Sequence, residues 1–195
     1  MDLPSTRTSV AGVGASSRPW RIGRLAGPIA LGALVVAAAA QVVVPVPLSP
    51  VPMTLQPLAV LIVGGLLGAT AGVSALALYL ALGALGLPVF AAGGSGVLHL
   101  IGPTGGYLLA FPVAAGVTGA LVRPAPSSVL RVLLACALGM VIIHAGGVAQ
   151  LALLGGNPTL AFQVGFIPFL TGDLLKVGLG AAVILAVGPR LRPLL

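Results

Sequence analysis

The feature that most constrains this chain is its scarcity of charge. Among 195 residues there are nine Lys or Arg and two Asp or Glu, so 6% are charged while 58% are hydrophobic. A soluble domain carries about 25% charged residues, so this chain has too little polar surface to fold as a soluble globule. Its mean hydropathy of +1.21 also excludes disorder over most of its length. We therefore predict an all-α, polytopic membrane protein with lipid as its main solvent.

Apolar runs long enough for helices recur along the chain and predict six transmembrane helices. They lie at about 25–44, 57–69, 70–87, 105–122, 131–154 and 172–188. Because one span needs about 20 apolar residues, the length leaves no room for an additional soluble domain. We expect a disordered cytoplasmic tail over 1–24, a membrane domain over 25–188 and a short cytoplasmic C-terminus over 189–195. The stretch 68–72 is expected to be the turn between the second and third helices.

The arginines predict how the helices are oriented. With the N-terminus inside, every arginine falls on the cytoplasmic side, as the positive-inside rule requires. These are Arg7, Arg18, Arg21, Arg24, Arg123, Arg131, Arg190 and Arg192. The outer connections, 45–56, 88–104 and 155–171, contain neither Lys nor Arg. Because the basic residues form no single patch, we expect no nucleic-acid partner.

The first apolar run also allows a second interpretation. It follows arginines and contains Ala38-Ala39-Ala40, which is the pattern of a cleaved signal peptide. Its uninterrupted continuation to Val44 favours a retained helix.

Five prolines lie between residues 45 and 57, in the first outer connection and just after it. Proline fixes φ and favours an extended path, so we expect a stiff, apolar segment here. Two interpretations remain open: a lid over a ligand pocket, or a rigid linker at the membrane surface.

Two charges lie apart from the arginines and from Asp2 in the tail: Asp173 and Lys176. Their i, i+3 spacing places them on one face of the last helix, close to its outer end. Ionisable residues at membrane depth are expensive and by default functional. Lys176 can donate to an anion or a carbonyl oxygen, and Asp173 can accept from N–H groups. We therefore predict that the pair binds a small polar ligand; a self-satisfied ion pair between helices is the alternative.

Other polar residues give weaker signals. His99 and His144 are isolated from any cysteine ligand, so no metal site is expected, and His144 is interpreted as an interhelical hydrogen-bonding residue. The segment Gly93–Gly96 fits the Gly-x-Ser-Gly pattern of rhomboid intramembrane proteases, with Ser95 as nucleophile and His144 as base. No phosphate-binding loop of the Gly-x-x-x-x-Gly-Lys-Ser/Thr type is present, so we expect no ATP hydrolysis by that route.

A stripe of alanines runs along the first helix at i, i+4, i+7 and i+11: Ala26, Ala30, Ala33 and Ala37. Small residues let another helix approach closely. The stripe therefore predicts a helix contact, either with a partner protein or with a helix of the same chain.

Four stretches of the chain resemble one known family. They are Pro50–Gln56, Gly83–Phe90, Gly102–Tyr107 and Pro168–Lys176. These segments, in this order, are similar to the signature segments of BioY proteins, the biotin-binding S components of energy-coupling factor (ECF) transporters. The resemblance extends from about residue 25 to 188.

The resemblance implies a six-helix S-component fold in the bacterial cytoplasmic membrane, with both termini inside. It implies biotin uptake without enzymatic activity. By analogy, biotin is bound by Asp173 and Lys176, with Tyr107, Gly93, Gly94, Thr54 and Gln56 completing the pocket. The implied partners are a transmembrane coupling subunit and two ATPase subunits, which use the ATP, so the chain itself needs no cofactor. The alanine stripe resembles the surface on which such partners dock.

Three other functions remain as alternatives: an intramembrane serine protease, an S component for another small vitamin, and a non-catalytic scaffold. A scaffold predicts that changing Asp173 and Lys176 affects folding alone.

Overall fold

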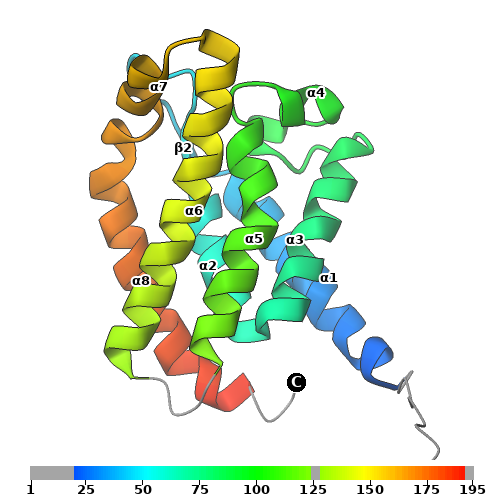
Figure 1. Ribbon diagram of the computed structural model, residues 1–195. Helices are drawn as coiled ribbons and strands as arrows, with labels where there is room; N and C mark the ends of the chain where they lie inside the picture. The colour runs from blue at the N-terminus through cyan, green and yellow to red at the C-terminus, as the bar shows by residue number, and fades with distance from the viewer. Residues whose placement is uncertain (1–19, 124–127, 192–195) are drawn as a thin grey trace, which may run out of the picture.

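The computed structural model describes residues 20–123 and 128–191, with side chains from residue 25 onward. Six principal helices form an upright bundle (Figure 1). They are α1 (Trp20–Ala40), α2 (Gln56–Leu67), α3 (Ala69–Ala84), α5 (Gly105–Val122), α6 (Val129–Gly155) and α8 (Leu170–Leu191). They correspond one to one with the predicted spans and confirm the all-α membrane fold.

The principal helices differ in length. Three helical stretches are long and apolar enough to cross a membrane: Gly105–Val122, Val129–Gly155 and the consecutive Pro158–Leu191. Helices α2 and α3 are shorter, at Gln56–Leu67 and Ala69–Ala84. Helix α2 has only 12 residues, so it spans about 18 Å, well under the ~30 Å of a bilayer core.

The first helix begins earlier and the last helix ends later than predicted. Helix α1 begins at Trp20, so residues 20–24 continue the helix instead of belonging to the tail. Helix α8 extends to Leu191, past Pro189, and the Arg190 side chain donates to the carbonyl oxygen of Ala186 near the helix end. The remaining tail, 1–19, and the last residues, 192–195, lie outside the described part of the chain.

The turn between α2 and α3 is a single residue, not the predicted segment 68–72. Gly68 has φ +83°, a conformation that residues with a Cβ rarely adopt. Its missing side chain also leaves room for Arg123, whose guanidinium donates to the last carbonyl of α2, at Leu67, over 3.0 Å. Gly68 and its contact with Arg123 thus form the connection that was predicted as a five-residue turn.

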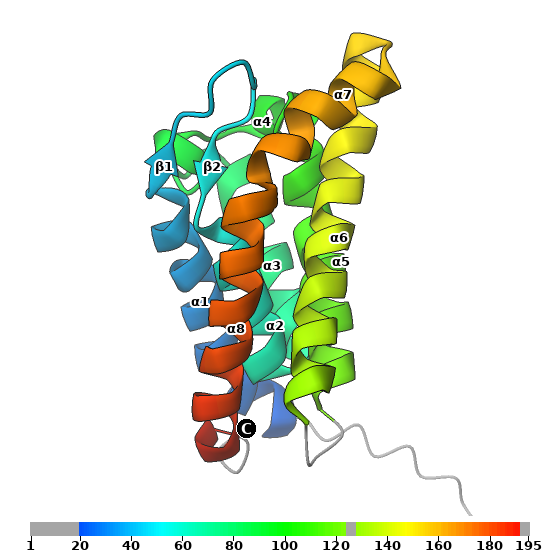
Figure 2. The same cartoon turned by 90° about the vertical axis from the view of Figure 1, so that its left-hand side faces the viewer.

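The connections at the opposite end contain short elements that hydropathy did not predict. The first outer connection contains an antiparallel hairpin of β1 (Val43–Val44) and β2 (Met53–Thr54), paired Val43 to Thr54 and Val44 to Met53. A 3-10 turn (Ala91–Gly93) and α4 (Val97–Ile101) form the second connection, and α7 (Pro158–Gly165) with a 3-10 turn (Ile167–Phe169) forms the third. Figure 2 shows the hairpin, α4 and α7 gathered at one end of the bundle.

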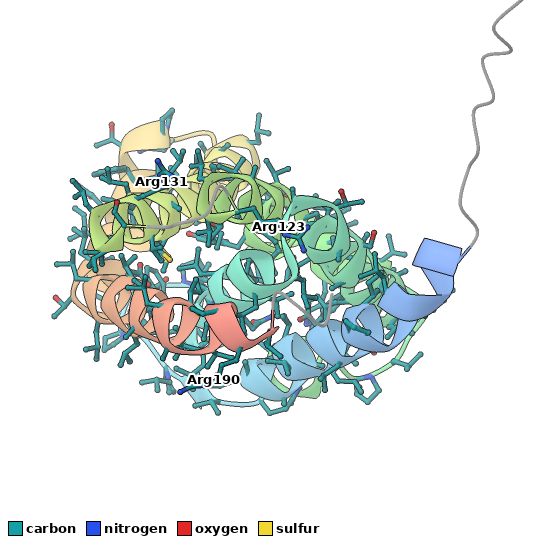
Figure 3. The ribbon with its side chains drawn as sticks, turned by 90° about the horizontal axis from the view of Figure 1, so that it is seen from below. Arg123, Arg131 and Arg190 are labelled. Atoms are coloured by element: carbon teal, nitrogen blue, oxygen red, sulfur yellow. The ribbon has the colours of Figure 1, made fainter. Side chains whose placement is uncertain are left out.

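The two ends of the bundle differ in charge. We call the end with the hairpin, α4 and α7 the cavity end. The other end carries Arg123, Arg131 and Arg190, seen from below in Figure 3, and we call it the basic end. Between the two ends, α5 and α6 make the most extensive helix pair of the described chain, and α1 packs on α3. The core between them is rich in alanine and other apolar residues.

Candidate functional site

A cavity of about 180 Å³ opens at the cavity end of the bundle. Its walls come from the hairpin, the start of α2, the 3-10 turn with α4, and from α5, α6 and α8. Most of the lining is apolar and includes Met53, Phe90, Leu108, Phe111, Ile143 and Phe169. A mostly apolar cavity with a few polar groups is the usual form of a small-molecule site.

The floor of the cavity holds a buried cluster of three ionisable residues. Asp173 is 5% exposed, Lys176 5% and His144 6%. The Lys176 ammonium donates to Asp173 Oδ1 over 3.0 Å, and His144 Nε2 lies 2.5 Å from Asp173 Oδ2. Both carboxylate oxygens therefore have a partner, which offsets much of the cost of burying the charge. We call this set the floor cluster.

A shared backbone carbonyl supports the floor cluster from behind. The carbonyl oxygen of Gly165, the last residue of α7, accepts from the Tyr107 hydroxyl over 2.6 Å. His144 Nδ1 lies 3.3 Å from the same oxygen. The rings of Tyr107 and His144 meet edge to face, with centroids 5.9 Å apart. The carbonyl at the end of α7 thus ties α5 and α6 to α7.

A second polar group lies where the hairpin enters α2. The Gln56 side chain is 4% exposed and donates to the Tyr79 hydroxyl over 2.6 Å. The Thr54 hydroxyl donates to Gln56 Oε1 over 3.1 Å and accepts from the Gln56 backbone N–H over 3.3 Å. Since proline follows at residue 57, Thr54 and Gln56 fix the start of a helix that lacks one N–H donor. Both residues line the cavity.

The outer wall is formed by the segment after α3. Phe90 is fully buried and packs against Tyr79, with ring centroids 5.5 Å apart. Gln41, just after α1, accepts from the Gly93 N–H over 3.1 Å and donates to the Phe90 carbonyl over 3.2 Å. Ala92 has φ +53°, an unusual conformation for a residue with a side chain. The segment is therefore held in place by α1 and by the aromatic core.

The structure brings five of the seven predicted binding residues to one cavity. These are Thr54, Gln56, Tyr107, Asp173 and Lys176. Gly93 and Gly94 are not among the lining residues; the neighbouring Ala91 and Ala92 line the wall instead. The first outer connection also contributes Val51 and Pro52 to the cavity, as expected of a lid and not of a linker.

His144 was predicted as an interhelical residue but not as part of the site. The prediction of an interhelical hydrogen bond is confirmed, because His144 on α6 pairs with Asp173 on α8. Its position in the cavity lining was missed. The signal available was a polar residue inside an apolar span, which pointed to a partner without identifying it.

The alanine stripe of α1 is divided between two environments. Ala33 is 2% exposed, and Ala37 packs against the core of the same chain. Ala26 and Ala30 are exposed. Because Ala33 is covered by the chain's own helices, it does not belong to an exposed partner surface. The half of the stripe with Ala33 and Ala37 therefore makes contacts within the chain.

The described residues do not form the protease arrangement. The nitrogens of His144 face Asp173 and Gly165, while the Ser95 carbonyl faces a different histidine, His99, at 3.0 Å from its Nδ1. Across the described ranges, no group of three or more His, Cys, Asp or Glu side chains is arranged to hold a metal ion. The free Cys136 is buried.

Comparisons with known proteins agree with this architecture. The biotin transporter BioY of Thermotoga maritima is 41% identical over 140 residues, covering 72% of this chain and 82% of the relative. The probable biotin transporter BioY of Pyrococcus horikoshii is 39% identical over 145 residues, with the same coverage of each chain. A crystal structure of the S-component for biotin from an ECF-type ABC transporter superposes with a TM-score of 0.79 at 23% identity, covering 89% of this chain and 94% of that one.

The structural match shows the fold, and the sequence matches show the family. The family model of BioY matches residues 17–193, which include every principal helix of the bundle. Both curated relatives exceed 30% identity over more than two thirds of this chain. The chain is therefore a member of the BioY family.

Proposed function

We propose that this chain binds biotin and is the substrate-binding subunit of an ECF transporter that takes up biotin across the cytoplasmic membrane. Membership of the BioY family supports this function, as do relatives named biotin transporters. The same names do not support the serine protease alternative. The observation that carries the proposal is the floor cluster, a buried set of donors and acceptors at the base of an apolar cavity.

The chemistry of biotin matches this cavity. Its ureido group has two N–H donors and one carbonyl acceptor, fused to an apolar sulfur ring. Asp173 can accept from an N–H group, and Lys176 can donate to the carbonyl oxygen. Each carboxylate oxygen has more than one lone pair, so Asp173 can accept a ligand N–H while it remains bound to Lys176 and His144. The aromatic and aliphatic wall suits the sulfur ring.

The remaining predicted residues have supporting parts in the proposed site. Tyr107 holds the floor in place through Gly165, and Thr54 with Gln56 positions the hairpin beside the ligand. Gly93 and Gly94 act behind the wall, where Gln41 binds the Gly93 N–H. The hairpin closes the cavity from the side that we assign to the cell exterior.

The proposed partners are a transmembrane coupling subunit and two ATPase subunits, which would use the ATP. We assign the basic end to the cytoplasm because arginines gather there. The exposed Ala26 and Ala30, on the half of α1 nearer the basic end, are proposed as part of the surface that meets the coupling subunit.

Calorimetric titration of the purified protein with biotin tests the ligand. Wild type should bind, and Lys176→Met should bind about tenfold to a hundredfold more weakly, since it loses a charged hydrogen-bond donor. Leu175→Met is the matched control, because it places the same residue on the exposed neighbouring face of α8, where Leu175 is 65% exposed. It should bind as wild type does.

Either of two results would refute the ligand assignment: wild type without biotin binding, or Lys176→Met with unchanged affinity. A thermal unfolding curve for each variant, recorded in the same detergent, ensures that lost binding is not lost folding.

Co-purification with the coupling and ATPase subunits tests the partner surface. Ala30→Trp should reduce the recovered complex while biotin binding persists. Leu138→Trp, on the lipid-facing side of α6, is the control. Equal recovery of both variants would contradict the docking surface alone.

A further inference from the structure

The segment of cavity wall after α3 is anchored at its two ends. At the first end, the ring of Phe90 fills the space that the missing side chain of Gly83 leaves on α3. At the other end, the Gly96 N–H donates to the Gly83 carbonyl over 2.7 Å. The 3-10 turn between these anchors, Ala91–Gly93, contains no buried residue. Burial in the core therefore does not determine the conformation of the turn.

This turn has a conformation that alanine does not prefer. Ala92 has φ +53° and ψ +35°, which is the left-handed region. A Cβ crowds the backbone there, so an unrestrained chain would rotate Ala92 to a negative φ. Ala91 and Ala92 both line the cavity, and such a rotation would change the shape of its wall. The turn therefore needs a restraint from outside to keep this shape.

Gln41 supplies hydrogen bonds on both sides of the turn. Its amide nitrogen donates to the Phe90 carbonyl over 3.2 Å, and to the Ala37 carbonyl in the last turn of α1 over 3.1 Å. Its amide oxygen accepts from the Gly93 N–H over 3.1 Å. In the described part of the chain, no other side chain forms a hydrogen bond with the backbone of residues 90–93. Two carbonyls and one N–H require two donors and one acceptor, which is the set that an amide group has.

Gln41 itself lies outside the cavity. It directly follows the last residue of α1, it is exposed, and it is not among the residues that line the cavity. Helix α1 contacts the 3-10 turn, so the side chain joins the end of this helix to the back of the wall. Any effect of Gln41 on a ligand therefore acts through the turn and not through direct contact.

Resting on the proposed function, we propose that Gln41 is a positioning residue for biotin binding. It holds the turn in the left-handed conformation in which Ala91 and Ala92 form the cavity wall. A wall that is in place before the ligand arrives needs no ordering when the ligand binds. Without Gln41 the turn relaxes, and the apparent affinity falls by the fraction of molecules that still have the wall in place.

Calorimetric titration with biotin compares Gln41→Met with a matched control, Val42→Met. Methionine is similar to glutamine in length but has no N–H donor. Gln41→Met should bind biotin about tenfold more weakly than wild type, which is the factor set by the cost of a left-handed alanine. Val42→Met places the same residue at the adjacent position, where Val42 is 49% exposed, and should bind as wild type does. Wild-type affinity in Gln41→Met would overturn the proposal.

A second position separates positioning from a general structural role. Glycine adopts positive φ about as readily as negative φ, so Ala92→Gly removes the preference that Gln41 opposes. Adding Gln41→Met to Ala92→Gly should weaken biotin binding by less than about threefold relative to Ala92→Gly alone, so the two changes should not be additive. An equal, tenfold loss in both backgrounds would overturn the proposal, because Gln41 would then act independently of the turn. A wild type that binds no biotin would instead refute the proposed function.

Discussion

The cavity end and the basic end hold charges in opposite ways. At the cavity end Asp173, Lys176 and His144 are buried and satisfy one another. At the basic end the described arginines are exposed; Arg123 and Arg190 donate to carbonyl oxygens near helix ends. A buried pair is costly to break, whereas an exposed cap contributes little. Buried charges therefore mark the proposed ligand site at one end, and exposed arginines mark the proposed cytoplasmic side at the other.

The largest expected difference between the two ends is in their accessibility to a reagent added outside the cell, and it should be all or none. In cells, a membrane-impermeant maleimide added outside should label Leu48→Cys, because Leu48 is 96% exposed at the hairpin. Arg190→Cys should react only after the membrane is permeabilised. Wild type serves as the control, since Cys136 is fully buried. Labelling of Arg190→Cys from outside would reverse our assignment of the two ends.

Breaking the buried pair should have the next largest effect. Asp173→Leu leaves Lys176 buried without its carboxylate and should lower the free energy of unfolding by about 3–5 kcal/mol. Asp173→Leu combined with Lys176→Met should recover most of that loss, because no unpaired charge remains, while biotin binding stays absent. Denaturant unfolding in detergent measures both. A double variant as unstable as the single one would show that the pair does not act through its charge.

Added bulk beside Tyr107, which supports the floor cluster, should lower the free energy of unfolding by less. A Cβ at Gly147 would overlap the ring of Tyr107, so Gly147→Ala should destabilise the protein by about 1–3 kcal/mol and weaken biotin binding. Gly178→Ala on α8 is the control, since nothing lies within 4 Å of its Cβ. It should gain about 0.5–1 kcal/mol from helix propensity. Equal unfolding midpoints for the two variants would contradict the close packing of Tyr107.

The smallest effect is expected at the basic end. Gly68→Ala should destabilise the protein by about 1–2 kcal/mol, because alanine disfavours a positive φ. It should also displace Arg123, whose guanidinium fills the space of the new Cβ. Adding Arg123→Ala should relieve the overlap without restoring wild-type stability. None of these changes should alter biotin affinity; an affinity change would mean that the two ends are coupled.

The helices were predictable because hydropathy acts locally. Residues 105–122 coincide with α5, and the other spans differ by a few residues at their ends. The short elements of the cavity end were not predictable in this way. Prolines predicted an extended first connection, but the pairing of Val43 with Thr54 depends on a chain reversal that composition does not specify. Helices α4 and α7 lie in segments without a distinct periodic signal.

The candidate site was predictable to the extent that charge is rare. Asp173 and Lys176 are conspicuous because almost nothing else in the spans is ionisable. The role of His144 depends on contact between residues 29 positions apart on α6 and α8, which no local pattern encodes. The exchange of Gly93 and Gly94 for Ala91 and Ala92 in the lining follows from the backbone turn at Ala92, again a matter of tertiary structure.

The short length of α2 determines how deep in the membrane a ligand in the cavity would lie. Its first residues, Gln56 and Pro57, line the cavity, and it ends at Leu67 beside Arg123. Only about 18 Å of helix therefore separates the cavity from the basic end, against the ~30 Å of a full hydrocarbon core. Binding alone would carry the vitamin through more than a third of the barrier. In the proposed transporter, the step driven by the ATPase subunits has to open a passage only as long as a twelve-residue helix.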